Sequence, residues 1–182
     1  MNEVVKAIKN RRSVRKYKPE QINEDILNTI IEAGIFAPSA HNQQPWHFTV
    51  IQNKELLQDI NLKTRESMLE SEVDWIQKMA SKTDFKVTYG APTLIVVSGR
   101  KDALAWPADC AAAIQNMLIA AESLNIGSVW LGLLRFYFAR EEVKALKIPE
   151  GYEPYYGAVF GYKVLEHQQA PKRKMNVVHY IK

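Results

Sequence analysis

The segment from residue 108 to residue 121 constrains the fold more than any other part of the sequence. It places alanine, isoleucine, leucine, methionine and cysteine around almost the whole circumference of a predicted helix. Such a helix is stable when every side of it is covered. A chain of 182 residues has little room to enclose a helix completely, so we expect a second subunit to cover part of it.

Length and composition favour one compact domain, residues 1–182, because 47% of the residues are hydrophobic and no repeat or low-complexity tract is visible. The first residues lack the pattern of a signal peptide, and no apolar stretch approaches membrane-spanning length. We therefore expect no membrane partner. The single cysteine, Cys110, rules out an intramolecular disulfide and fits a reducing, cytoplasmic location.

The order of the predicted elements mixes helices and strands without strict alternation, which favours an α+β sandwich over a doubly wound parallel sheet. Helices are expected at 3–10, from a cap at Asn23 to Gly34, over 54–80 as one or two helices, at 108–121 with Gly127 as the terminator, and at 140–147. Strands are expected at 46–50, 93–97, 128–133, 156–162 and 176–181. The β-branched run 93–97 predicts a strand that is buried on both faces, in the middle of the sheet.

The formal net charge is +4, and the basic residues are densest near the two ends of the chain, in Arg11–Lys16 and in Lys172–Lys174. Two short clusters favour a small anion, although each alone is also compatible with a solvated basic surface. Nucleic acid is not expected as a partner, because there is no dense basic tract with interleaved aromatic residues.

Several kinds of site are not supported by the sequence. It contains no G-x-G-x-x-G and no phosphate-binding P-loop motif, so side chains must bind the anion. The guanidinium of arginine suits this task because it grips phosphate bidentately, and Ser13 adds a hydroxyl. The four histidines, His41, His47, His167 and His179, show no metal-ligand spacing, so no metal is expected. Cys110 is interpreted as an inert buried thiol, and Ser39 lacks the context of a hydrolase nucleophile.

Several segments together resemble the nitroreductase family of FMN enzymes. They are Arg11–Tyr17, Ala37–Phe48, Tyr89–Pro92, Ala112–Gly127, Trp130–Gly132, Pro171–Lys174 and Val178–Tyr180. Each piece alone is weak, but their order along nearly the whole chain is specific. The resemblance implies an α/β/α sandwich with a central, mostly antiparallel sheet and an intertwined homodimer that holds FMN between its subunits.

The resemblance also implies a role for individual residues. Arg11 would hold the FMN phosphate together with Lys172, Arg173 and Lys174, while Ser13 would bond ribityl or phosphate oxygens. Arg12 would contribute through neighbouring backbone, and Arg15 would reach the N1/O2 edge of the flavin, where a fixed cation stabilises the reduced form. The residues implied from the partner chain are Pro38, Ser39, Ala40, Asn42 and Gln44. The residues implied along the ring are Trp130, Leu131 and Gly132, with a main-chain N–H near N5; packing in the core is an equal interpretation for Trp46 and Trp130.

The function implied is a two-step cycle in which NADH or NADPH reduces the flavin and a small organic acceptor, such as a nitroaromatic or a quinone, reoxidises it. No side chain is expected to be an obligatory general acid, so no catalytic residue is assigned. Residues 62–88 and 135–138 are expected to cover the pocket. The alternatives are a specialised flavin enzyme, such as a dehalogenase or a ring oxidase, and a flavin storage protein whose flavin NAD(P)H does not reduce.

Overall fold

A four-stranded antiparallel sheet forms the centre of the molecule, with the strand order β1-β2-β4-β3. The computed structural model of the chain describes residues 2–165 and 169–182. The strands are β1 (Trp46–Ile51), β2 (Thr93–Arg100), β3 (Ile126–Leu131) and β4 (Tyr152–Tyr162). Their positions confirm four of the five predicted strands, and the sheet confirms the predicted α+β architecture.

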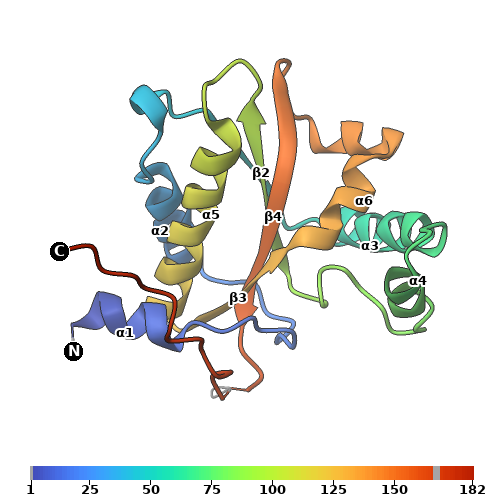
Figure 1. Ribbon diagram of the computed structural model, residues 1–182. Helices are drawn as coiled ribbons and strands as arrows, with labels where there is room; N and C mark the ends of the chain where they lie inside the picture. The colour runs from blue at the N-terminus through green and yellow to red at the C-terminus, as the bar shows by residue number, and fades with distance from the viewer. Residues whose placement is uncertain (1, 166–168) are drawn as a thin grey trace.

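Helices cover both faces of this sheet (Figure 1). The first layer contains α1 (Glu3–Asn10), α2 (Glu24–Ile35) and α5 (Trp106–Ser123). The second contains α3 (Lys54–Leu69), α4 (Asp74–Ala80) and α6 (Arg135–Phe138). Short 3-10 helices are η1 (Ala40–Asn42), η2 (Gly132–Leu134) and η3 (Glu141–Leu146), the last lying where a helix over 140–147 was predicted. Within the described residues, no helix combines the length and the apolar character needed to cross a membrane.

Strand β2 shows why the core has two halves. Ile95 and Val97 pack with α2 and α5 on one face, whereas Leu94 and Val96 pack with α3 and α6 on the other. Side chains alternate between the faces of a strand, so an unbroken apolar run supplies both layers. The prediction of a central strand buried on both faces is therefore confirmed.

Helix α2 begins as its sequence predicts, because the side chain of Asn23 accepts a hydrogen bond of 2.8 Å from the backbone N–H of Asp25. The predicted terminator of α5 was wrong. That helix ends at Ser123, and the left-handed residue in the following turn is Asn125, with φ 57°. Gly127 instead lies inside β3, where an added Cβ would meet Val14 and Lys163 at 3.0 Å. Its function is close packing rather than helix termination.

The predicted strand at 176–181 was also wrong, because residues 169–182 have neither helical nor strand structure. The alternation of valine and tyrosine that suggested a strand is present, but a strand needs a partner to accept its backbone hydrogen bonds. Val177, Tyr180 and Ile181 are all more than 70% exposed. This segment runs past α1 and α5 (Figure 1) and leaves its apolar side chains uncovered in the protomer.

Candidate functional site

Residues 11–17 form an ordered loop that follows α1 and packs against Ser128 of β3. The Nη1 atom of Arg12 turns back and donates to the carbonyl oxygens of Lys9 at 2.8 Å and Arg11 at 2.7 Å. The backbone N–H of Val14 donates to Ser128 of β3 at 3.0 Å, and the hydroxyl of Tyr17 donates to Val14 at 2.6 Å. These bonds fix the backbone of Ser13, which forms a parallel bridge with Ser128.

Positive charge accumulates at this loop. Burial lowers the pKa of the Arg11 guanidinium, and the charges of Arg12 and Arg173 lower it further, against the opposing effect of Glu122. That carboxylate is already paired, since its Oε2 lies 2.9 Å from Nζ of Lys163. The Nε atom of Arg12 is buried and has no hydrogen-bond partner among the described residues. Arg11, Arg12 and Arg173 form a cationic cluster with unused donors, which suits a phosphate group.

The C-terminal segment supplies the other two predicted phosphate ligands. Lys172 and Lys174 flank Arg173 and are exposed. Of these three basic residues, Arg173 is the one whose charge lowers the pKa of Arg11. Arg11 and Arg173, which are 162 positions apart in the sequence, therefore lie near enough for their charges to interact.

Arg15 lies on the neighbouring surface, and its guanidinium carbon is 5.6 Å from the centroid of the Tyr89 ring. Its Nη1 atom also donates to the carbonyl oxygen of Ser13 at 3.3 Å. Arg15 and Tyr89 both line a cavity of about 640 Å³ that extends to Phe85 and Lys86. The cation–π contact orients a guanidinium at the mouth of this cavity, where it can meet developing negative charge.

A second cavity, of about 380 Å³, adjoins the first through Tyr89 and Phe85. Trp130, Leu131 and Gly132 line it, as expected of a wall along a flat ring. The rings of Trp130 and Tyr156 meet edge to face with their centroids 5.3 Å apart. A Cβ added to Gly132 would have no heavy atom within 4 Å, so this backbone faces open space that a bound ring can fill.

The sequence analysis gave no role to several residues of this wall. Tyr89 and Tyr156 line the cavity, and so do Trp75, Phe85 and Arg135, which come from the two segments expected to cover the pocket. Gly90, which follows Tyr89, is the sequence feature that could have indicated a turn at this tyrosine. Both residues have positive φ, 53° at Tyr89 and 71° at Gly90, so the chain reverses sharply there and presents the tyrosine ring to Arg15.

The predicted loop residues Pro38, Ser39, Ala40, Asn42 and Gln44 lie between α2 and β1, in a loop that is held by its own hydrogen bonds. The N–H of Ala40 donates to Oδ1 of Asp109 at 3.2 Å. The N–H of Gln44 donates to Oγ of Ser39, and its Nε2 donates to Oδ1 of Asn42, both at 3.0 Å. His41, Asn42 and Gln44 all have positive φ. The loop is thus a rigid platform, and Pro38, Asn42 and Gln44 are exposed.

This platform is far from the cationic cluster of the same protomer. The loop contacts Asp109 at the start of α5, whereas Arg11 is influenced by Glu122 at its end. At 1.5 Å per residue these two positions are about 20 Å apart. Figure 1 shows the two loops at opposite ends of the molecule. The protomer gathers Arg11–Arg15, Trp130–Gly132 and Arg173, but it does not bring Pro38–Gln44 to them.

Other candidate chemistry is not assembled. No group of three or more histidine, cysteine, aspartate or glutamate side chains suited to a metal occurs within residues 2–165 and 169–182. His41 and His179 are exposed, and His47 packs edge to face on Tyr152 with centroids 5.9 Å apart. His167 lies outside the described residues.

The thiol of Cys110 is expected to be unreactive in the folded protein. It is fully buried, and burial raises the pKa of its thiol to about 12, with a smaller contribution from the Asp109 carboxylate. A thiol reagent at pH 8 should therefore label native protein at least about a hundredfold more slowly than guanidinium-unfolded protein. Mass spectrometry of the time course measures this ratio; rapid labelling of the native protein would show that the helix opens or that the thiolate is accessible.

Comparison with known proteins identifies the fold family. The sequence profile of the nitroreductase family matches residues 8–162. The chain belongs to the nitroreductase family. A relative in Archaeoglobus fulgidus, provisionally named an NADH dehydrogenase/NAD(P)H nitroreductase, is 37% identical over 155 residues, which cover 82% of this chain and 79% of the relative. An FMN reductase (NAD(P)H) of Bacillus subtilis is 27% identical over 190 residues, covering 99% of this chain and 74% of the relative.

Two solved nitroreductase structures have the same fold over their whole length. One from Bacteroides fragilis, described with bound FMN, superposes with a TM-score of 0.91 at 34% identity and covers 100% of both chains. One from Desulfitobacterium hafniense, also described with bound FMN, superposes with a TM-score of 0.89 at 29% identity and again covers 100% of both chains. The nitroreductase family implied by the sequence motifs is thus confirmed.

Proposed function

We propose that this nitroreductase-family chain is an FMN-dependent oxidoreductase that takes electrons from NADH or NADPH and delivers them to a small organic acceptor. The observation that carries the proposal is the cluster of Arg11, Arg12 and Arg173 beside an aromatic cavity. A cationic cluster with unused donors suits a phosphate, and the adjoining cavity suits a flat ring. FMN has both parts, and the related enzymes named above are FMN proteins or NAD(P)H oxidoreductases.

The residues of the chain fit FMN in two groups. Around the phosphate we place Arg11, Lys172, Arg173 and Lys174, with Ser13 at the ribityl or phosphate oxygens and Arg12 supporting the loop through its backbone hydrogen bonds. Along the ring we place Arg15 at the N1/O2 edge and Trp130, Leu131 and Gly132 with a main-chain N–H near N5. The opposite side of the ring is assigned to Pro38, Ser39, Ala40, Asn42 and Gln44 of the partner subunit.

We infer a homodimer because, within a protomer, the platform contacts the start of α5 whereas the cationic cluster lies near its end, about 20 Å away along the helix. A two-fold axis brings the end of one protomer to the opposite end of the other, which completes two equivalent sites. Two surfaces support this arrangement. Gln115 of α5 is exposed and Ile119 is half-exposed on a helix whose sequence predicts burial on all sides. The C-terminal segment also exposes Val177, Tyr180 and Ile181.

When bound, FMN would supply two-electron transfer at N5 between NAD(P)H and the acceptor. The chain contributes position and electrostatics. Arg15 places a permanent positive charge at the cavity mouth, and the aromatic wall of Trp130 and Tyr156 excludes water from one side of the ring. The described lining of the cavity that contains Trp130 includes no histidine or carboxylate, so we expect no obligatory side-chain acid. Donor and acceptor are expected to use this cavity in turn.

Anaerobic titration of FMN-loaded protein with NADH, and separately with NADPH, tests this function. The flavin absorbance band should bleach with at least one donor within seconds, and a nitroaromatic or a quinone should restore it. Free FMN at the same concentration is the control for direct reduction. Bound flavin that stays oxidised with both donors would favour a storage protein, and failure to bind flavin would contradict the proposal entirely.

A further inference from the structure

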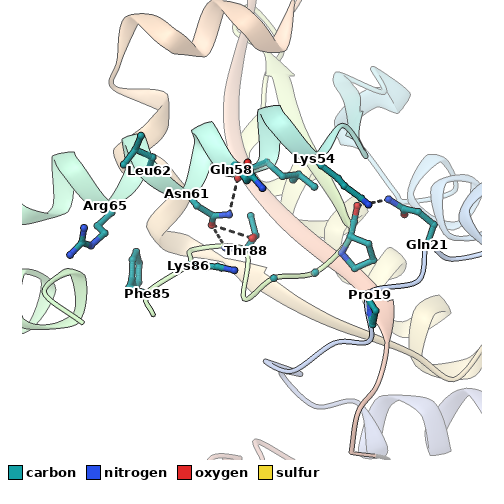
Figure 2. A pocket seen from close by; sticks show the side chains of 14 residues that line it. Pro19, Gln21, Lys54, Gln58, Asn61, Leu62, Arg65, Phe85, Lys86 and Thr88 are labelled. Carbon is teal, nitrogen blue, oxygen red and sulfur yellow. Dashed lines mark hydrogen bonds between the residues drawn. The ribbon is translucent and has the colours of Figure 1, made fainter. Parts of the chain in front are cut away.

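A separate pocket of about 380 Å³ lies between α3 and the segment that leads into β2 (Figure 2). Figure 2 shows α3 as one wall, the residues around Lys86 and Thr88 as the facing wall, and Pro19 with Gln21 at one end. None of the residues that we place around FMN lines this pocket. Phe85, Lys86 and Gly90 also line the cavities near Arg15, but the proposed oxidoreductase activity gives the rest of this lining no function.

The walls of the pocket are held in place by hydrogen bonds. Oδ1 of Asn61 accepts from the backbone N–H of Thr88 at 3.0 Å and from its hydroxyl at 3.1 Å. At the other end, Nε2 of Gln21 donates to the carbonyl oxygen of Pro92 at 2.8 Å. These bonds tie α3 and the loop after Lys18 to the same facing segment, so the pocket is largely formed before a ligand arrives.

The charge of the lining has one sign. Lys54, Arg65 and Lys86 line the pocket, and its described lining includes no aspartate or glutamate. None of the three cations is ion-paired within the part of the chain that the structure describes. Lys54 extends from α3 toward Gln21 at one end of the pocket, and Lys86 extends from the facing segment (Figure 2). An anionic group is the complement of this arrangement.

The rest of the lining is apolar. Leu57, Leu62, Phe85 and Ala91 contribute hydrocarbon surface, and Phe85 presents an aromatic ring near the Arg65 end (Figure 2). A pocket that combines an apolar wall with a few charged groups typically orients an amphipathic small molecule. The volume is sufficient for a ring with a short aliphatic chain and too small for a folded peptide segment.

We propose that this pocket is a second binding site of the protein, for a small carboxylate with an apolar or aromatic tail. The carboxylate lies at the Lys54 end of the pocket, and the tail extends along Leu57 and Leu62 toward Phe85. Occupation also affects the electron-transfer site, because Phe85, Lys86 and Gly90 line both this pocket and the cavity that contains Arg15 and Tyr89. A ligand that contacts this shared wall acts on the segment that positions Tyr89, on which Arg15 packs.

Isothermal titration calorimetry tests the binding site with phenylbutyrate as the probe and its uncharged amide as the comparison, both on FMN-loaded protein. The carboxylate should bind at least about tenfold more tightly than the amide, because a charge-assisted contact is lost in the amide. Lys54→Gln should weaken phenylbutyrate binding by about tenfold and leave amide binding unchanged. Lys54 is exposed at the start of α3, so its replacement does not threaten folding. The matched control is Lys144→Gln, an exposed lysine of η3 outside this pocket, which should bind like the unmodified protein.

Equal affinity for acid and amide, or an unchanged affinity in Lys54→Gln, would overturn the site. Repetition of the titration on FMN-free protein separates this result from the proposed function, since none of our FMN-binding residues lines the pocket. The coupling is tested by the rate of flavin bleaching with saturating phenylbutyrate. A change of at least about twofold that disappears in Lys54→Gln supports it, and an unchanged rate would overturn the coupling.

Discussion

Protein that carries both Arg11→Ala and Arg173→Ala should lose almost all of its FMN during gel filtration. Burial lowers the pKa of the Arg11 guanidinium, and the positive charges of Arg12 and Arg173 lower it further. Arg173 therefore lies close to Arg11. A phosphate between them would relieve this repulsion and form charge-assisted hydrogen bonds, each contributing about 1.5–3 kcal/mol. We therefore expect each single variant to bind FMN about 10–100 times more weakly, and the double variant on the order of a thousand times more weakly.

Quenching of FMN fluorescence during titration of the flavin-free protein measures these affinities. Lys144→Ala removes an exposed positive charge far from the cluster and serves as the control for net charge, with an expected change of less than about twofold. Added salt should weaken FMN binding to the unmodified protein more than to the double variant, because fewer charges remain to be screened. FMN affinity that is unchanged in the double variant would refute the phosphate assignment.

Leu94→Ala should destabilise the protein more than any surface substitution. Leu94 is fully buried in central strand β2 and packs in the cluster that joins the sheet to α3 and α6. Removal of a buried leucine side chain costs about 2–5 kcal/mol, because transfer free energy is lost and a cavity remains. In a chain of this size the melting temperature should fall by about 5–15 °C.

Leu104→Ala provides the matched control, since Leu104 is 72% exposed in the turn before α5. Its effect on the free energy of unfolding is expected to stay within about 0.5 kcal/mol. Both variants should be compared by urea denaturation at one protein concentration, because the proposed dimer would make the apparent stability concentration-dependent. A smaller loss for Leu94→Ala than for Leu104→Ala would contradict the assignment of the core.

Local patterns predicted most of the secondary structure because they depend on neighbours in the sequence. The cap at Asn23 and the β-branched run in β2 each specify an element by backbone or burial chemistry within a few residues. The segment 176–181 has an equally strand-like pattern but forms no strand, since pairing depends on a partner strand that the pattern cannot supply. The termination of α5 depends on Asn125 in a left-handed conformation, a role that glycine fills more often.

The candidate site was less accessible to local reasoning. The basic clusters marked Arg11 and Arg173 by composition, but their proximity is a property of the fold. The aromatic wall was missed at Tyr89 and Tyr156, because single tyrosines in strand-like or loop segments carry no sign of which cavity they face. The family resemblance supplied the platform at Pro38–Gln44, and the structure adds that this platform lies at the far end of the same protomer.

The most direct test of the composite flavin site is the FMN content of a mixed dimer. One subunit would carry Arg11→Ala and the other Asn42→Ala with Gln44→Ala, and the two homodimers of the variants serve as flavin-poor controls. If each site takes its phosphate ligands from one subunit and its platform from the other, one site receives both defects and the second is intact. The mixed dimer should then bind about half as much FMN as the unmodified dimer. A mixed dimer as poor in FMN as its parents, or a protein that stays monomeric at micromolar concentration, would contradict the account.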